Sequence, residues 1–76
     1  MDRAADVAIK AVILGLYRSK AINARQVTVV AAELGYAATH LNPPDAQVSA
    51  DIEALGQWLE KAIEGENRGR NLLSRF

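Results

Sequence analysis

The only histidine of the chain, His40, lies close in sequence to Asp45 and Ser49, and these are the three residue types of a nucleophilic catalytic triad. A triad requires the imidazole to lie within hydrogen-bond reach of both partners, and nothing in this spacing favours that arrangement. Neighbouring prolines indicate an interhelical loop, where polar side chains commonly serve solvation and helix capping. A metal ion would find at most two ligands here, whereas structural sites usually need four. We therefore expect neither a catalytic nor a metal site around His40.

The carboxylates Glu53, Glu60 and Glu64 raise the alternative of a two-metal site inside a helical bundle. Such sites need Glu-x-x-His pairs that point inward from several helices. Here the helical spacing places the glutamates opposite the apolar residues, which indicates a solvated strip. The chain also lacks cysteine and both common phosphate-loop patterns, G-x-G-x-x-G and G-x-x-x-x-G-K-[ST]. The sequence predicts a protein that is not an enzyme and binds no cofactor.

One stretch looks like the first half of a DNA-binding helix-turn-helix, with Ala31 and Gly35 at the positions of that motif's usual alanine and glycine. In the motif, a recognition helix follows the glycine turn and reads base edges. Pro43 and Pro44 would fall inside that helix, where each costs on the order of 3 kcal/mol. Residues 36–56 also hold three acids and no Lys or Arg. DNA recognition is therefore kept only as an alternative.

The charges of the chain cancel overall, with nine basic and nine acidic residues, but they are unevenly spread. Residues 1–41 carry a net +2, residues 42–66 a net −5 and residues 67–76 a net +3. Proteins that follow phosphate backbones need many cations on one face, so we expect no nucleic-acid partner. The acidic middle and the basic end indicate charge matching, within the chain or between chains.

Composition favours a helical fold. Half of the 76 residues are apolar, alanine is abundant, and aromatic residues, glycine and proline are few. A chain of this length buries only about 60% of its unfolded surface, so its core is marginal. We expect an all-α fold: one domain over residues 1–76, built as a small bundle of three main helices plus a short C-terminal helix. The expected bounds are about 2–19, 23–35 (or as far as 41 if Gly35 does not end the helix), 43–64 and 67–75.

The start of the second helix carries the clearest local signal. Asn23 and Gln26 have the spacing of a capping box, and Ile22 and Val27 have that of a hydrophobic staple. Residues 27–30, Val-Thr-Val-Val, would suit a strand if taken alone. The cap and the helix formers that follow decide in favour of a helix.

The third helix is expected to begin with Asn42 as its N-cap and Pro43 in the first helical position. Apolar residues then recur with spacings of 4, 3, 4 and 3, as in the seam of a bundle helix: Val48, Ile52, Leu55, Leu59 and Ala62. Gly65 is expected to end this helix. The tail beyond it is predicted to dock as a short amphipathic segment, because free tails rarely end in exposed leucine and phenylalanine.

The first helix carries apolar residues on two sides. The larger set has i, i+3, i+4 spacing and is expected to face the core: Ala5, Ala8, Ile9, Val12, Ile13 and Leu16. Val7, Ala11 and Leu14 form the second set, and charged residues, including the i, i+4 pair Asp6 and Lys10, separate the two. A helix that is apolar on both sides is usually buried within something larger. We therefore expect a homodimer whose interface contains Val7, Ala11 and Leu14.

These observations predict a small non-enzymatic protein–protein interaction module, of the adaptor or inhibitor type. It is expected to act as a homodimer that presents helix faces to a protein target. The candidate residues for binding that target are Trp58, Glu53, Glu60, Glu64, Arg68, Arg70, Leu72, Leu73 and Phe76. The alternatives are a helix-turn-helix-like DNA-binding regulator and a structural subunit of a larger assembly.

The longest strongly apolar run, from Ala11 to Tyr17, is much shorter than the roughly 18 residues needed to cross a bilayer. Charged residues flank this run and acids precede it, a pattern that differs from a secretory signal peptide. We expect no membrane contact and a cytoplasmic location. The abundance of alanine and the excess of arginine over lysine indicate a GC-rich bacterium or one of its phages as the source.

Overall fold

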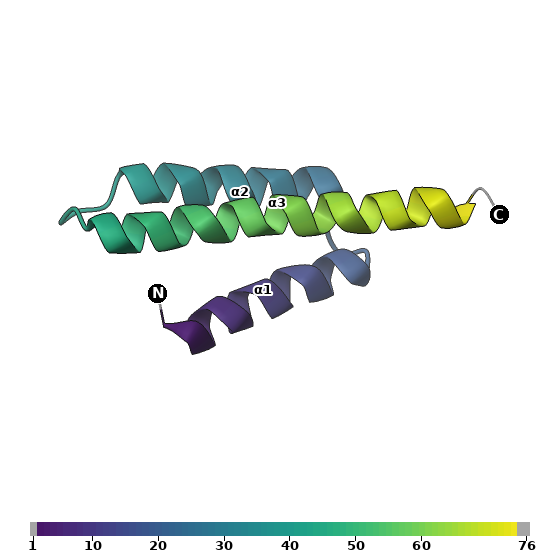
Figure 1. Ribbon diagram of the computed structural model, residues 1–76, viewed down its shortest axis with the longest axis horizontal. Helices are drawn as coiled ribbons and strands as arrows, with labels where there is room; N and C mark the ends of the chain where they lie inside the picture. Colours follow the sequence, from purple (N-terminus) through teal and green to yellow (C-terminus); the bar gives the residue numbers. More distant parts are fainter. Residues whose placement is uncertain (1, 75–76) are drawn as a thin grey trace.

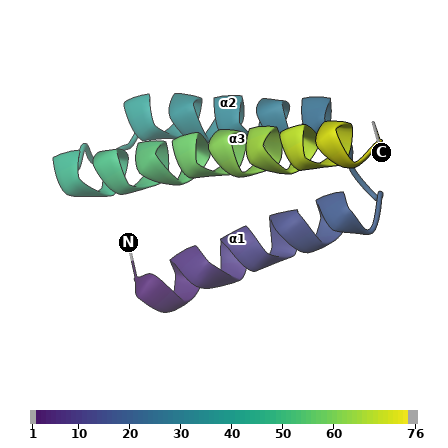
Figure 2. The same cartoon turned by 45° about the vertical axis from the view of Figure 1, so that its right-hand side comes forward.

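The computed structural model describes the backbone of residues 2–74 and the side chains of residues 2–66. Three helices make up this part of the chain: α1 (Arg3–Arg18), α2 (Ala24–Thr39) and α3 (Ala46–Ser74), with no strand among the described residues. Helices α2 and α3 lie side by side as an antiparallel hairpin, and α1 runs alongside it (Figure 1). Turning the molecule shows that α1 diverges from the hairpin toward its N-terminal end (Figure 2). The predicted all-helical bundle is confirmed.

The core lies mainly between α2 and α3. Five buried residues form its central cluster: Tyr17, Val27, Leu55, Leu59 and Ile63. Gly56 allows the two helices to approach closely, because a Cβ atom at this position would lie 3.2 Å from the carbonyl oxygen of Ala31 on α2. The close approach compensates for the cost of about 1 kcal/mol that glycine brings to a helix interior.

The capping box at the start of α2 is confirmed. The Gln26 N–H donates to Asn23 Oδ1 at 2.8 Å, and the Asn23 N–H donates to Gln26 Oε1 at 2.8 Å. Residues 27–30 are helical, and Val27 is almost completely buried. The cap and the burial of an apolar face outweigh the β propensity of this stretch. Helix α2 also continues through Gly35 to Thr39, so the turn of a helix-turn-helix is not at that glycine.

The connection between α2 and α3 differs from the prediction. Helix α3 begins at Ala46 rather than at Pro43, and Asp45 caps it by accepting a hydrogen bond from the Val48 N–H at 3.0 Å. Asn42 is therefore not the N-cap. Pro44 disfavours a helical conformation at Pro43, so the helix can start only after both prolines.

The separate C-terminal helix expected at residues 67–75 is also wrong, because residues 67–74 continue α3 without a break. Gly65 lies inside the helix and does not end it. One glycine costs a helix about 1 kcal/mol, which does not stop a helix that neither proline nor a turn signal interrupts. Helix α3 is thus 29 residues long, against 16 residues each for α1 and α2.

Helix α1 packs on the core through a different face from the one predicted. Tyr17 is buried with an exposed fraction of 5%, and Ile13 and Leu14 pack partly buried against the same cluster. The residues predicted to face the core are, apart from Ile13, exposed: Ala5, Ala8, Ile9, Val12 and Leu16. Tyr17 does not belong to the predicted set, yet its burial removes more apolar area from water than the burial of several alanines.

Candidate interaction surface

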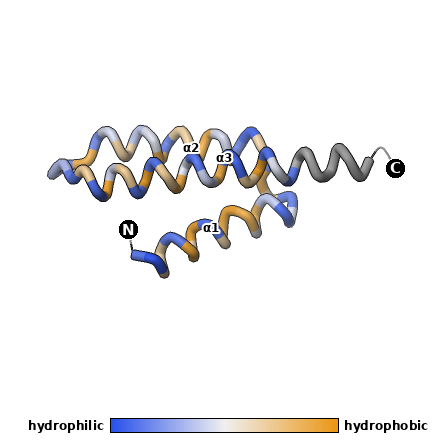
Figure 3. Tube along the Cα trace, in the orientation of Figure 1, coloured by the Kyte–Doolittle hydropathy of each residue, from blue (hydrophilic) through white to orange (hydrophobic). Residues whose placement is uncertain are grey.

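Exposed apolar residues cover the side of α1 that faces away from the hairpin. We call this surface the outer face of α1, and its members are Ala4, Ala5, Ala8, Ile9, Ala11, Val12, Gly15 and Leu16, all of them exposed. Val12 has an exposed fraction of 60% and Leu16 one of 41%. At 100° per residue these side chains form one continuous surface that contains no charged residue. The hydropathy trace marks the same helix as largely hydrophobic beyond its first residues (Figure 3).

Gly15 belongs to the outer face and differs from Gly56. A Cβ atom at Gly15 would meet nothing within 4 Å. Glycine inside a helix costs about 1 kcal/mol relative to alanine, and no contact within the described chain compensates for that cost. Gly15 therefore leaves the backbone of the outer face of α1 open on this side.

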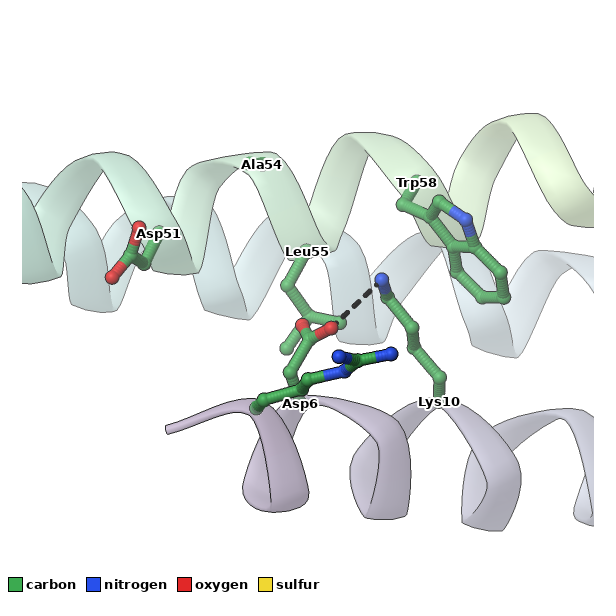
Figure 4. Close-up of a pocket in the computed structure, with 7 residues that line it drawn as sticks. Asp6, Lys10, Asp51, Ala54, Leu55 and Trp58 are labelled. Atoms are coloured by element: carbon green, nitrogen blue, oxygen red, sulfur yellow. Dashed lines mark ion pairs between the residues drawn. The ribbon is translucent and has the colours of Figure 1, made fainter. Parts of the chain in front are cut away.

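The charged residues of α1 lie on its inner side, toward α3. Arg3, Asp6 and Lys10 line an open cleft of about 420 Å³ whose α3 wall includes Leu55 and Trp58. Lys10 Nζ lies 2.9 Å from Asp6 Oδ2 and 4.5 Å from the centre of the Trp58 ring (Figure 4). In an ordinary amphipathic helix the apolar face would be turned to the core and the charged face to water. The arrangement in the N-terminal half of α1 is the reverse.

The C-terminal end of α1 is fixed to the hairpin by packing and by an ion pair. Besides the packing of Tyr17, Arg18 forms an ion pair with Glu66 on α3, with Nε to Oε1 at 2.7 Å and Nη2 to Oε1 at 2.6 Å. The Arg18 side chain is mostly exposed, so this pair contributes at most about 1 kcal/mol. The cleft between the helices opens toward the other end of α1, where charged groups rather than packed apolar side chains face α3.

The predicted interface residues share a stripe of α1 but differ in their exposure. Val7 and Ala11 are exposed, but Leu14 packs against the core of its own chain. The predicted second set is therefore divided between the surface and the core. The outer face of α1 keeps Ala11 and otherwise consists largely of residues that had been assigned to the core.

The residues predicted to bind a target lie on α3 or beyond the described side chains. Trp58 is about one-third exposed and forms part of the cleft wall, next to Lys10. Glu53, Glu60 and Glu64 are exposed, as the spacing had predicted. Arg68, Arg70, Leu72, Leu73 and Phe76 lie outside the residues whose side chains are described.

The three residues that resembled a triad make their hydrogen bonds elsewhere. His40 Nδ1 lies 2.9 Å from the Tyr36 carbonyl oxygen, and the Ser49 hydroxyl donates to the Ala38 carbonyl at 2.6 Å. Asp45 is occupied as the cap of α3. Among the described residues, no group of three or more His, Cys, Asp or Glu side chains could hold a metal ion.

One surface feature was not anticipated from the sequence. On α2 the rings of Tyr36 and His40 are stacked, with centroids 3.9 Å apart and planes inclined by 15°. Their i, i+4 spacing is compatible with such contact, but it becomes a signal only once the helix is known to pass Gly35. Tyr36 and Val29 are the exposed large apolar residues of α2.

These features describe a small all-helical protein with one apolar helix face left uncovered. Comparisons with protein-family models, curated proteins and solved structures found no match to this chain. Within residues 2–74, no helix combines the length and the apolar character needed to cross a membrane.

Proposed function

We propose that this protein is a small non-enzymatic interaction module that self-associates through the outer face of α1 and presents helix surfaces to a protein target. The observation that carries the proposal is the reversed amphipathicity of α1, with its charges toward α3 and its apolar residues toward solvent. Contiguous apolar surface that is exposed in a single chain commonly marks an interface. Burying a valine, leucine or isoleucine side chain completely contributes about 1.5–3 kcal/mol.

The surface that faces the target is proposed to lie on α3. Glu53, Glu60 and Glu64 lie away from the apolar seam of that helix, and Trp58 is partly exposed at the edge of the cleft. Aromatic side chains are frequent among the residues that dominate binding energy, and carboxylates favour a basic partner. The glutamates and Trp58 lie on different sides of α3, and neither belongs to the outer face of α1, so a dimer can display each of them twice.

The test of self-association is the mass of the protein in solution between about 1 μM and 1 mM, the range of weak complexes. We expect a two-chain species that Val12→Glu disperses, because the substitution places a charge in the buried contact. Val29→Glu is the matched control, since Val29 is a valine on α2 with a similar exposed fraction of 55%. A single-chain mass for the unchanged protein throughout this range would overturn the proposal.

The two other proposals from the sequence are distinguished by the same preparation. A DNA-binding regulator requires retention of duplex DNA at low salt, weakened when Arg18, Lys20 and Arg25 are neutralised. A structural subunit requires a mass well above two chains. Neither result is expected from a dimeric interaction module.

A further inference from the structure

The outer face of α1 consists of two parallel rows of residues along the helix. Ala5, Ile9, Val12 and Leu16 form the first row, with spacings of 4, 3 and 4, which is the spacing of a coiled-coil seam. The second row has the same spacings and contains only small residues: Ala4, Ala8, Ala11 and Gly15. The first row supplies large side chains for packing, and the second allows another helix to approach closely.

The order of sizes along the first row distinguishes two ways of covering it with an identical helix. In a parallel pair each residue would meet its own copy, so Ala5 would face Ala5 and Leu16 would face Leu16. The pair would then be underpacked at the Ala5 end, which destabilises it. In an antiparallel pair Ala5 faces Leu16 and Ile9 faces Val12, so every layer holds a similar side-chain volume.

The charges at the two ends of α1 favour the same orientation. Asp2 stands at the N-terminal end of the helix and Lys20 just beyond its C-terminal end, and both are exposed. An antiparallel pair brings each Asp2 near the Lys20 of the other copy and places Arg3 level with Arg18, whose charge Glu66 balances within its own chain. A parallel pair would bring the two copies of Lys20 together. The helix dipoles also oppose each other favourably in the antiparallel pair. No charged residue lies on the outer face between these ends to oppose a second copy.

We propose that a second copy of this chain covers the outer face of α1, with the two α1 helices antiparallel so that Ala5 lies against Leu16 and Ile9 against Val12 of the second copy. The inference rests on the proposed self-association and adds the orientation and register of the contact. The same patch serves both copies, so the pairing is two-fold symmetric and closes at two chains.

The length of α1 limits the strength of this contact. Sixteen residues give a helix about 24 Å long and about 10 Å wide, so its footprint is a few hundred Å². Stable interfaces bury about 800 Å² per partner, and smaller ones are typical of weak, reversible complexes. The dimer is therefore expected to dissociate on dilution into the low micromolar range.

Disulfide cross-linking tests the register directly, because the natural sequence contains no cysteine. The variants Ala5→Cys and Leu16→Cys are mixed in equal amounts in a glutathione redox buffer, and mass spectrometry separates the three disulfide products. In the antiparallel pair the two Ala5 positions lie about 16 Å apart along the helices, beyond the roughly 7 Å that a disulfide spans. We expect the mixed product to exceed either symmetric product by about tenfold.

A third variant, Val29→Cys on α2, gives the background from random collisions. A symmetric Ala5 disulfide well above this background, or a mixed product no more abundant than random pairing gives, would overturn the antiparallel register.

Native mass measurement of the unchanged chain distinguishes failure of the register from failure of the self-association. A dimer without the mixed disulfide contradicts only the register, whereas a monomer throughout contradicts the self-association itself. All three positions are exposed, so the fold does not depend on them.

Discussion

The ammonium group of Lys10 lies 4.5 Å from the centre of the Trp58 ring, and this contact spans the cleft between α1 and α3. Lys10 is at the same time paired with Asp6 on its own helix. Lys10 is thus a contact of the N-terminal half of α1 with α3 in which a cation lies against an aromatic ring. Such a contact is worth about 0.5–1 kcal/mol at an exposed site, so its own contribution to stability is small.

The first prediction concerns this contact. Lys10→Gln removes the cation, and we expect the free energy of unfolding to fall by no more than about 1 kcal/mol. Trp58 is the only tryptophan in the chain, so its fluorescence reports on the cleft alone, and we expect the emission to change. Lys20→Gln, at an exposed lysine in the turn after α1, serves as the control and should leave the emission unchanged. Identical spectra for the two variants would contradict the contact.

The second prediction compares two leucines of α1. Leu14 packs against the core cluster, whereas Leu16 is exposed on the outer face. We expect Leu14→Ala to lower the free energy of unfolding by about 1–3 kcal/mol, below the full cost of a buried leucine because Leu14 is only partly buried. Leu16→Ala should change it by less than about 0.5 kcal/mol in dilute, monomeric protein.

Chemical denaturation at low micromolar concentration measures both variants, and the concentration dependence of the mass measures their effect on pairing. Leu16→Ala is expected to weaken the pairing while leaving the single chain stable. Equal losses of stability for the two variants would show that α1 does not pack on the hairpin through Leu14.

Local signals in the sequence predicted some features of the fold and not others. The three helices and the capping box of Asn23 follow from residues close together in the chain, and the structure confirms them. The start of α3 was misplaced because Pro43 was considered without the restriction that Pro44 imposes on it. The continuation of α3 past Gly65 depends on the balance between one weak position and the good helix formers around it.

The candidate interaction surface was harder to predict for a different reason. The sequence shows that α1 is apolar on two sides, but it cannot show which side meets α3. That choice depends on Tyr17, which is buried only because α2 and α3 together form a site for it. The tertiary structure therefore decides which side of α1 faces α3, and the periodicity of α1 alone cannot predict it.

The third prediction contrasts two glycines inside helices. Gly56→Ala places a Cβ atom 3.2 Å from the backbone carbonyl oxygen of Ala31, which cannot move without shifting α2. We expect it to destabilise the protein by about 1–3 kcal/mol, the usual cost of overpacking. Gly15→Ala meets open space, so it should stabilise dilute, monomeric protein by about 0.5–1 kcal/mol through the better helix propensity of alanine. Thermal or chemical unfolding measures both, and a stabilising Gly56→Ala would contradict the close approach of α2 and α3.

The fourth prediction concerns two asparagines that the sequence alone had assigned the same role. Asn23 accepts a hydrogen bond from the Gln26 N–H at the start of α2, while Asn42 precedes the prolines and Asp45 caps α3 in its place. Asn23→Ala should therefore lower the free energy of unfolding by about 0.5–2 kcal/mol, and Asn42→Ala should lower it much less. Asp45→Ala should cost as much as Asn23→Ala, because it leaves the Val48 N–H without its cap. Denaturant titrations measure the free energy of unfolding of the three variants. A large loss for Asn42→Ala together with a small loss for Asp45→Ala would show that α3 begins at the prolines.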